Sequence, residues 1–274
     1  MGLGSLAKKL FRTLARVIPQ CGMISQAVAF NMFLAFFPIL LVALGLVSGF
    51  LGRENGQEPA ARLAAILPPG SAQLISEFLL RHQVNAFRWV LLGWAGTLLV
   101  GSQVMKLIME GIHLIYGDRE RHSFLSRQLR GMLLFCVTIV GWFVAVVLSV
   151  FSTPLRQFVT LGFGQSALVR VFWNIMLPMV GLVLAMLVLA LIYRFARPQA
   201  TTWRSVLPGA SAATILWWGL TLMFGVYVRK MQFGLVYGTL AAVIGLMVWM
   251  ELSTMIVFLG AAWNAESIPD ATVS

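Results

Sequence analysis

One stretch of the sequence carries side chains that could do chemistry inside an otherwise apolar segment. Within residues 87–116, polar and titratable residues recur at three- and four-residue spacing: Gln103, Lys106, Glu110 and His113. At 100° per residue these positions fall within an arc of roughly 80°, so they form one polar stripe on a helix. A stripe that faces the interior of a helix bundle could line a hydrophilic path or bind an anionic headgroup.

The same stripe also has a structural interpretation. Lys106 and Glu110 lie four residues apart and can neutralise each other, while Lys106 extends toward the surface and His113 lies in the interface. Glu251, in another apolar segment, is a second acid that could pair with Lys106, and the sequence does not decide between the two acids. For Glu251 we expect an ion pair ahead of a proton or cation site. A charge at the centre of a span costs roughly 2.5–3.5 kcal/mol, so these residues are the first candidates for function.

Prolines and small residues mark further candidate positions. Pro38 and Pro178 lack an N–H, which frees the carbonyls of Leu34 and Asn174. Such breaks occur at transport sites and also as simple kinks. Asn31, seven residues before Pro38, could hydrogen-bond a neighbouring helix. A face of small residues that allows close helix contact consists of Gly234, Gly238, Ala242 and Gly245.

The composition requires lipid around most of the chain. Hydrophobic residues make up 59% of the 274 residues and charged residues 11%, whereas soluble domains contain about 25% charged residues. The net charge of +11 would suggest nucleic acid as a partner of a soluble protein. Here the basic residues lie mostly between apolar segments, so we expect contacts with membrane lipids and anionic headgroups at the cytoplasmic face, and no nucleic acid. The composition is also compatible with a homo-oligomer.

These residues are positioned by an all-α integral membrane fold, a single membrane domain over 1–274. A basic amphipathic helix is predicted within residues 1–20, suited to lying on a membrane surface. Two pieces at 60–67 and 71–80 are too short to cross and predict interfacial helices in the first extracytoplasmic connection. Apolar length predicts a six-helix transmembrane bundle with spans at about 27–51, 87–116, 131–151, 171–195, 209–228 and 235–263.

The distribution of lysine and arginine predicts the orientation. With six spans, eleven of these residues fall on the side of the N-terminus and of the loops after spans two and four, against eight on the other side. Cytoplasmic loops carry the excess of basic residues. We therefore expect a multi-pass protein of the bacterial inner membrane with both termini in the cytoplasm.

Catalytic motifs are missing from the sequence. The three histidines and two cysteines are scattered, and no HExxH or CxxC spacing could hold a metal. The chain has no GxSxG elbow and no phosphate-binding GxxxxGK[ST] loop. We expect no catalytic residues, metal or cofactor, and therefore no enzyme.

Several short segments, in their order and spacing, resemble the YihY/BrkB family of bacterial inner-membrane proteins over nearly the whole chain. These are residues 29–38 (AFNMFLAFFP), 110–125 (EGIHLIYGDRERHSFL), 193–195 (YRF), 208–209 (PG), 237–240 (YGTL) and 264–266 (NAE). His113 departs from the pattern, since the family often has asparagine there.

The resemblance implies six spans with both termini cytoplasmic. Members of the family are linked to serum resistance, as virulence factors, or to the movement of lipid-like envelope precursors; a ribonuclease label attached to the family finds no motif here. The leading hypothesis is a transporter or flippase-like protein for an amphipathic or anionic envelope component or a small solute. A non-transporting envelope scaffold is the alternative, and a membrane-associated ribonuclease is a third hypothesis.

Overall fold

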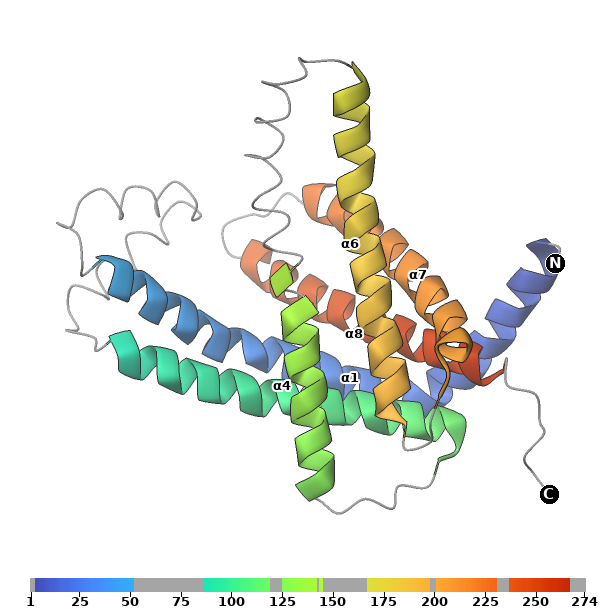
Figure 1. Ribbon diagram of the computed structural model, residues 1–274, viewed down its shortest axis with the longest axis horizontal. Helices are drawn as coiled ribbons and strands as arrows, with labels where there is room; N and C mark the ends of the chain where they lie inside the picture. The colour runs from blue at the N-terminus through green and yellow to red at the C-terminus, as the bar shows by residue number, and fades with distance from the viewer. Residues whose placement is uncertain are drawn as a thin grey trace. The chain divides into compact units, whose positions relative to one another are not determined.

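A computed structural model of the protein describes residues 3–51, 86–118, 125–141, 143–144, 167–197, 201–230 and 237–266 (Figure 1). Every regular element in these parts is a helix: α1 (Leu3–Leu51), α4 (Ala86–Tyr116), a helical segment over residues 125–141, α6 (Ala167–Ala196), α7 (Trp203–Lys230) and α8 (Tyr237–Ala265). The predicted all-α fold is confirmed for the described chain.

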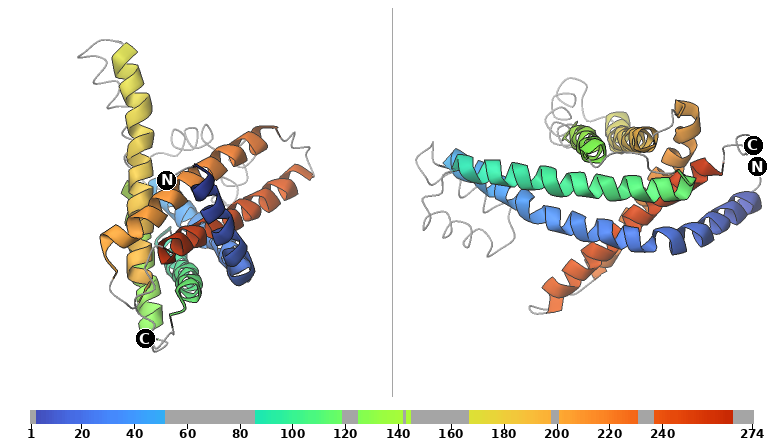
Figure 2. Two further views of the ribbon diagram at one scale, coloured as in Figure 1. Left: turned by 90° about the vertical axis from the view of Figure 1, so that its right-hand side faces the viewer. Right: turned by 90° about the horizontal axis from the view of Figure 1, so that it is seen from below.

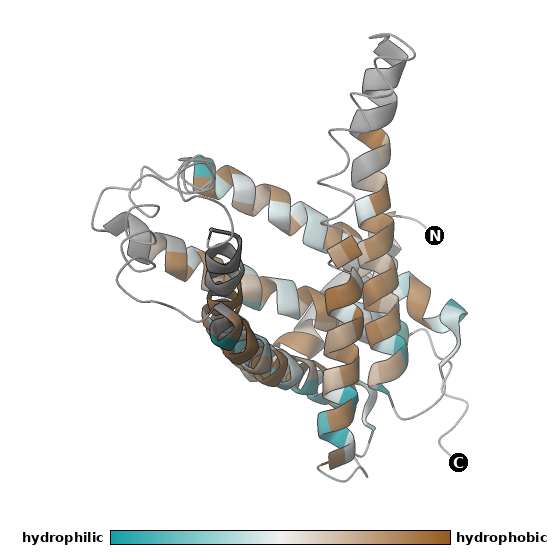
Figure 3. Ribbon diagram, turned by 60° about the vertical axis from the view of Figure 1, so that its left-hand side comes forward, coloured by the Kyte–Doolittle hydropathy of each residue, from teal (hydrophilic) through white to brown (hydrophobic). Residues whose placement is uncertain are grey.

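Five of these helices contain a stretch that is long and apolar enough to cross a membrane. The stretches are Val17–Ile39, Val90–Tyr116, Met179–Ala196, Trp203–Arg229 and Val243–Ala265. Figure 3 shows apolar residues along most of each described helix, with hydrophilic residues concentrated near helix ends. The remaining predicted span, 131–151, is described as helix over its first part, and its residues 145–151 lie outside the described residues.

Two predicted boundaries differ from the structure. The amphipathic helix predicted within residues 1–20 and the span predicted at 27–51 form one uninterrupted helix, α1, and its apolar stretch begins at Val17. The fifth span was predicted from about residue 209, but α7 already begins at Trp203. The predicted interfacial pieces at 60–67 and 71–80 lie outside the described residues.

Residues just before Pro208 explain the early start of α7. The carbonyl of Thr202 accepts hydrogen bonds from the N–H and the hydroxyl of Ser205, at 3.1 and 2.8 Å. These contacts close a turn at the beginning of the helix, directly after Thr202. Pro208 then falls in the second turn, where its missing N–H leaves the carbonyl of Arg204 without its usual helical donor. A proline there is compatible with a continuing helix.

Contacts between residues divide the chain into two units, and the smaller comprises Asn31–Gly101. In this unit, α1 and α4 approach each other at Pro38. A Cβ added to Gly93 would lie 2.7 Å from the carbonyl oxygen of Pro38, and one added to Gly96 would lie 2.9 Å from its Cβ. Pro38 therefore packs against a glycine face of α4, and Asn31 is half-buried in the same unit.

The larger unit, Met1–Phe30 with Ser102–Ser274, holds the closest helix contacts. There α7 lies next to both α6 and α8 (Figure 2). A Cβ on Gly209 of α7 would overlap the carbonyl oxygen of Gly260 of α8, and a Cβ on Gly260 would overlap the hydroxyl of Tyr193 of α6. Small residues let membrane helices approach to backbone contact in this way. On the other side of α8, the ring of Phe258 covers Gly111 of α4.

The predicted face of small residues on α8 is described in part. Gly234 lies outside the described residues, and Gly238 and Ala242 lie in α8 without a described side-chain environment. Gly245 is buried, and a Cβ there would lie 3.3 Å from the ring of Tyr227 in α7. The tightest contact with α7 is at Gly260, four turns further along α8.

Candidate functional site

The polar stripe of α4 meets the helical segment at residues 125–141. Nζ of Lys106 donates a hydrogen bond to Oε1 of Gln128 at 2.7 Å, and Nε2 of Gln128 donates to Oγ of Ser102 at 3.0 Å. A Cβ on Gly131 would lie 2.9 Å from both Cγ of Lys106 and the carbonyl oxygen of Ser102. The side chain of Lys106 therefore runs across Gly131 and ends on the amide of Gln128.

Glu110 is paired with a different cation. Its Oε2 accepts a hydrogen bond from Nη2 of Arg127 at 2.7 Å, and the side chains of Arg127 and Glu110 are 31% and 49% exposed. An exposed ion pair contributes about 0–1 kcal/mol to stability, so this contact holds the two helices together only weakly. The sequence left open whether Lys106 pairs with Glu110 or with Glu251; in the structure it contacts the neutral amide of Gln128.

Lys106 consequently keeps its positive charge uncompensated. Among the described residues, no carboxylate forms an ion pair with it. An ammonium has three N–H donors, and the contact with Gln128 uses one. The charge of Arg127 also acts on Lys106. Lys106, Arg127 and Glu110 together carry one net positive charge, beside the half-buried Gln103 of the same stripe.

His113 contacts the end of another helix. The side chain is buried, and its Nε2–H donates to the carbonyl of Ala196 at 2.8 Å. That carbonyl is the last of α6, so no N–H of the same helix is available to donate a hydrogen bond to it. His113 was a candidate for the polar path, and the structure places it at a junction of helix ends.

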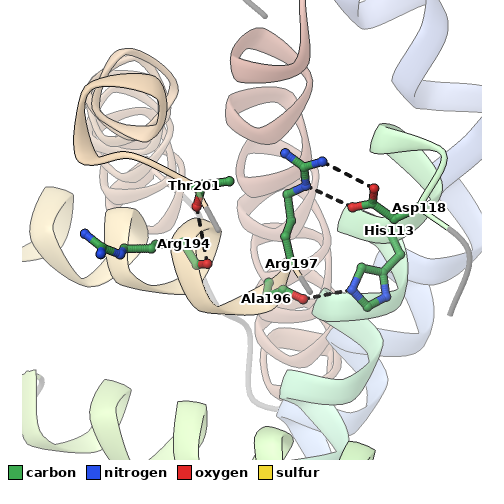
Figure 4. A network of polar contacts seen from close by, with 6 residues as sticks. All are labelled: His113, Asp118, Arg194, Ala196, Arg197 and Thr201. Atoms are coloured by element: carbon green, nitrogen blue, oxygen red, sulfur yellow. Dashed lines mark hydrogen bonds and ion pairs between the residues drawn. The ribbon is translucent and has the colours of Figure 1, made fainter. Parts of the chain in front are cut away.

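Gly117 positions an ion pair next to this junction. Its φ is +68°, and the N–H groups of Gly117 and Asp118 donate to the carbonyls of Leu114 and His113 at 3.3 and 3.0 Å. This is the glycine-capped helix end of the Schellman type. It directs Asp118 toward Arg197, whose Nε and Nη2 donate to the two carboxylate oxygens at 2.9 and 3.3 Å (Figure 4).

The Asp118–Arg197 pair is shielded from solvent. The side chains of Arg197 and Asp118 are 8% and 7% exposed, and the guanidinium carbon lies 3.9 Å from the centre of the Tyr116 ring. Burial removes most of the screening that weakens exposed pairs. The sequence interpretation did not single out Asp118 or Arg197. The signal available was Gly117 directly after an apolar helix, followed at once by an acid in a basic loop.

Asn264 ties α8 to the beginning of α7. Its Oδ1 accepts from the N–H of Gly209 at 2.6 Å, and its Nδ2 donates to the carbonyl of Val206 at 3.0 Å. The side chain is 1% exposed. Tyr193 of α6 makes a similar link, donating from its hydroxyl to the carbonyl of Val257 in α8 at 2.7 Å. The ends of α4, α6 and α8 and the start of α7 therefore meet at one end of the larger unit.

The remaining predicted site residues belong to other parts of the chain. Asn31 and Pro38 belong to the smaller unit, and Asn174 and Pro178 lie in α6 outside the described side chains. Glu251 is half-buried on α8, and within the described chain it forms no ion pair. No group of three or more histidine, cysteine, aspartate or glutamate residues that could hold a metal occurs in the part of the chain that the structure describes.

Comparison with known proteins places these helices in a family. Residues 19–271 match the family described as Virulence factor BrkB. This chain belongs to the BrkB family. The matched residues include Lys106, Asp118 and Arg197, and the resemblance seen in the sequence is confirmed. The protein is a multi-pass membrane protein of the BrkB and UPF0761 group.

Relatives of this BrkB-family chain carry two kinds of name. It is 26% identical over 254 residues to the ribonuclease-like protein YfkH of Bacillus subtilis, covering 90% of this chain and 91% of that protein. It is 25% identical over 256 residues to a UPF0761 membrane protein of Aromatoleum aromaticum, and 24% identical over 257 residues to one of Azoarcus. The match spans 90% of this chain and 60% of each of those two longer proteins. No solved structure matches.

Proposed function

We propose that this protein binds the anionic headgroup of an amphipathic envelope component at Lys106 and moves that component across the bacterial inner membrane. The observation that carries the proposal is the uncompensated ammonium of Lys106, held by Gln128 at 2.7 Å inside an apolar span. A charge in that setting is costly and is retained in membrane helices mainly where it binds or transports something.

The surroundings of Lys106 favour an anion as the ligand. The ammonium has donors to spare, and a bond from a charged donor contributes about 1.5–3 kcal/mol. Arg127 on the adjacent helix neutralises Glu110, and Arg130, one turn along that segment, is a second half-buried cation. A phosphate or carboxylate headgroup would meet this charge, while the exposed apolar faces of the helices would accommodate its chains.

The orientation of the protein is part of the proposal. The helix ends that meet at Asp118, Arg197 and Asn264 adjoin the loops rich in arginine. By the positive-inside rule we assign this end, and with it both termini, to the cytoplasm. Six spans then place Lys106 in the cytoplasmic half of its helix, ten residues before Tyr116. A headgroup loaded from the inner leaflet would reach it first.

A flux assay tests the proposal. The purified protein is reconstituted into vesicles of phosphatidylethanolamine and phosphatidylglycerol that contain a fluorescent phosphatidylglycerol, and transfer between leaflets is followed with a membrane-impermeant quencher. We expect Lys106→Ala to lower protein-dependent transfer about tenfold, the equivalent of losing one charged hydrogen bond. Arg229→Ala removes an exposed cation at the far end of α7 and serves as the matched control. Equal transfer by all three proteins contradicts the assignment of Lys106, and transfer no faster than in protein-free vesicles contradicts a transport role.

A non-enzymatic role is part of the same proposal. The ribonuclease-like name belongs to the Bacillus relative, and RNA cleavage by this protein would require a catalytic group that the stripe does not provide. Incubation of the purified protein with labelled RNA decides the matter: cleavage that co-purifies with the protein and is lost on one substitution would replace transport as the assigned function.

A further inference from the structure

The charged side chains within the described spans fall into three groups. Arg194, Arg204 and Arg229 lie within the first two or last three residues of their apolar stretches, within reach of the interface. Lys106 and Glu110 lie on α4, where Glu110 is paired with Arg127. Glu251 is the remaining one. It lies eight residues after Val243 and fourteen before Ala265, so it is about 12 Å along the helix axis from the nearer end of its apolar stretch.

Elements around α8 bring no described cation to Glu251. α4 meets α8 at Gly111 and Phe258. From residue 102 onward, each titratable group of α4 has its contact elsewhere: Lys106 with Gln128, Glu110 with Arg127, His113 with Ala196 and Tyr116 with Arg197. The titratable groups of the 125–141 segment are Arg127, Arg130 and Cys136. Among the described side chains of α6, the titratable groups are Tyr193, which is hydrogen-bonded to Val257, and Arg194, which stacks on Trp203.

The other two neighbours also lack a partner for this acid. Between Arg204 and Arg229, α7 carries Tyr227 as its one titratable side chain, and that residue is exposed. Between Val17 and Phe30, α1 carries only Cys21, whose Sγ faces the carbonyl of Gly111. The ion pair that the sequence favoured for Glu251 is therefore not seen among the described residues.

The ligand that fits a single carboxylate in this setting is a proton. Metal cations such as Ca²⁺ or Mg²⁺ require six or more oxygen ligands, and no group of three or more histidine, cysteine, aspartate or glutamate residues occurs at Glu251 within the described part of the chain. A proton needs one carboxylate, and its binding removes the charge that lipid disfavours. Uptake converts the carboxylate to a carboxylic acid, and release on the other side of the membrane restores it.

We infer that Glu251 is a proton-binding site through which the movement of the cargo is coupled to the proton gradient across the membrane. This coupling rests on the transport role proposed above, whereas proton binding by Glu251 does not. The two are tested separately.

Proton binding is tested by chemical labelling. Dicyclohexylcarbodiimide reacts with protonated carboxyl groups in apolar surroundings, so the protein in phosphatidylglycerol-containing vesicles is treated with it and mapped by mass spectrometry. We expect the label on Glu251 at least tenfold above that on the ion-paired Glu110, and we expect it to fall as the buffer is made more alkaline. Glu251→Gln should remove the label from this peptide. Labelling of Glu251 no stronger than that of Glu110 in the folded protein overturns the proton site.

Coupling is tested in the flux assay with an imposed pH gradient. We expect the gradient to change the rate of wild-type transfer severalfold. The rate of transfer by Glu251→Gln, whatever its value at equal pH on both sides, should not change when the gradient is imposed. Glu266→Gln, an acid at the end of α8, should respond like the wild type. Glu251→Asp, which retains a carboxylate, should keep part of the response. A wild-type response in the glutamine variant overturns the coupling; no transfer by the wild type overturns the transport role, and the labelling result still decides the proton site.

Discussion

Asp118 and Arg197 form a two-point ion pair at 2.9 and 3.3 Å in which both side chains are more than nine-tenths buried. The pair joins the end of α4 to the turn between α6 and α7, residues that are 79 positions apart in the sequence. Since a buried charge without its partner is strongly unfavourable, the two residues depend on each other for the stability of this junction.

Removing one partner should therefore destabilise the protein. We expect Asp118→Asn to lower the free energy of unfolding by about 3–5 kcal/mol, because it leaves the guanidinium of Arg197 buried without its counter-charge. Unfolding in detergent, followed by circular dichroism, measures the loss. Arg204→Lys, a change at an exposed cation near the start of α7, is the control. An Asp118→Asn variant that unfolds with the wild-type midpoint would show that the pair does not hold the junction.

The role of Gly117, which positions Asp118 at the end of α4, can be tested separately. Gly117 has a φ of +68°, yet a Cβ placed there would meet nothing within 4 Å. Gly117→Ala should thus cost about 1–2 kcal/mol through backbone strain alone. Gly117→Asn should cost less, since asparagine tolerates the left-handed conformation. Gly22 also has open space but lies inside α1, so Gly22→Ala should be neutral or stabilising; equal effects of the two alanines would contradict the role of the cap.

The positions of most helices could be predicted from the sequence, because long apolar segments alternate with short polar ones along the chain. The predicted spans at 87–116, 171–195 and 235–263 agree within a few residues with α4 (Ala86–Tyr116), α6 (Ala167–Ala196) and α8 (Tyr237–Ala265). The fifth span was predicted from about residue 209, whereas α7 begins at Trp203. The contacts of Thr202 with Ser205 start the helix earlier, and they look in the sequence like ordinary loop residues.

The candidate site was predictable only as a face of one helix. Helical periodicity places Lys106 and Glu110 on one stripe, but their partners, Gln128 and Arg127, come from another helix that no local pattern selects. Exposed i,i+4 pairs contribute only a few tenths of a kcal/mol, so a tertiary contact easily replaces them. Asn264 could not be assigned its contacts from the sequence either. It belongs to the 264–266 segment that resembles the family, but its hydrogen bonds to α7 depend on where α7 and α8 cross.

Close helix contact at Gly260 gives a third prediction. A Cβ there would overlap the hydroxyl of Tyr193 and lie 2.7 Å from the carbonyl oxygen of Gly209, so α6, α7 and α8 would have to move apart. We expect Gly260→Ala to cost about 1–3 kcal/mol, as overpacking does, measured by unfolding in detergent. Gly219→Ala in α7, where a Cβ would meet nothing within 4 Å, is the matched control. A similar small effect for both would mean that the helices separate readily at Gly260.

The last prediction concerns the charge at Lys106. Arg127 holds Glu110 away from Lys106 in an exposed pair, so Arg127→Ala should release a carboxylate one turn from the ammonium. That carboxylate would compete with an anionic headgroup, and we expect transfer of fluorescent phosphatidylglycerol to fall about tenfold. The variant has no net charge at the site, whereas Arg127→Ala with Glu110→Gln restores the single positive charge of the wild type.

The rate of phosphatidylglycerol transfer should follow the net charge at Lys106 in four proteins: the wild type, the two single variants and the double variant. The double variant should recover most of the wild-type rate, and Glu110→Gln alone, with two positive charges, should equal or exceed it. High salt should reduce the differences, because the groups involved are partly exposed. If the double variant stays as slow as Arg127→Ala, then Arg127 acts by contacting the cargo or by holding the 125–141 segment in place, and Glu110 does not compete for Lys106.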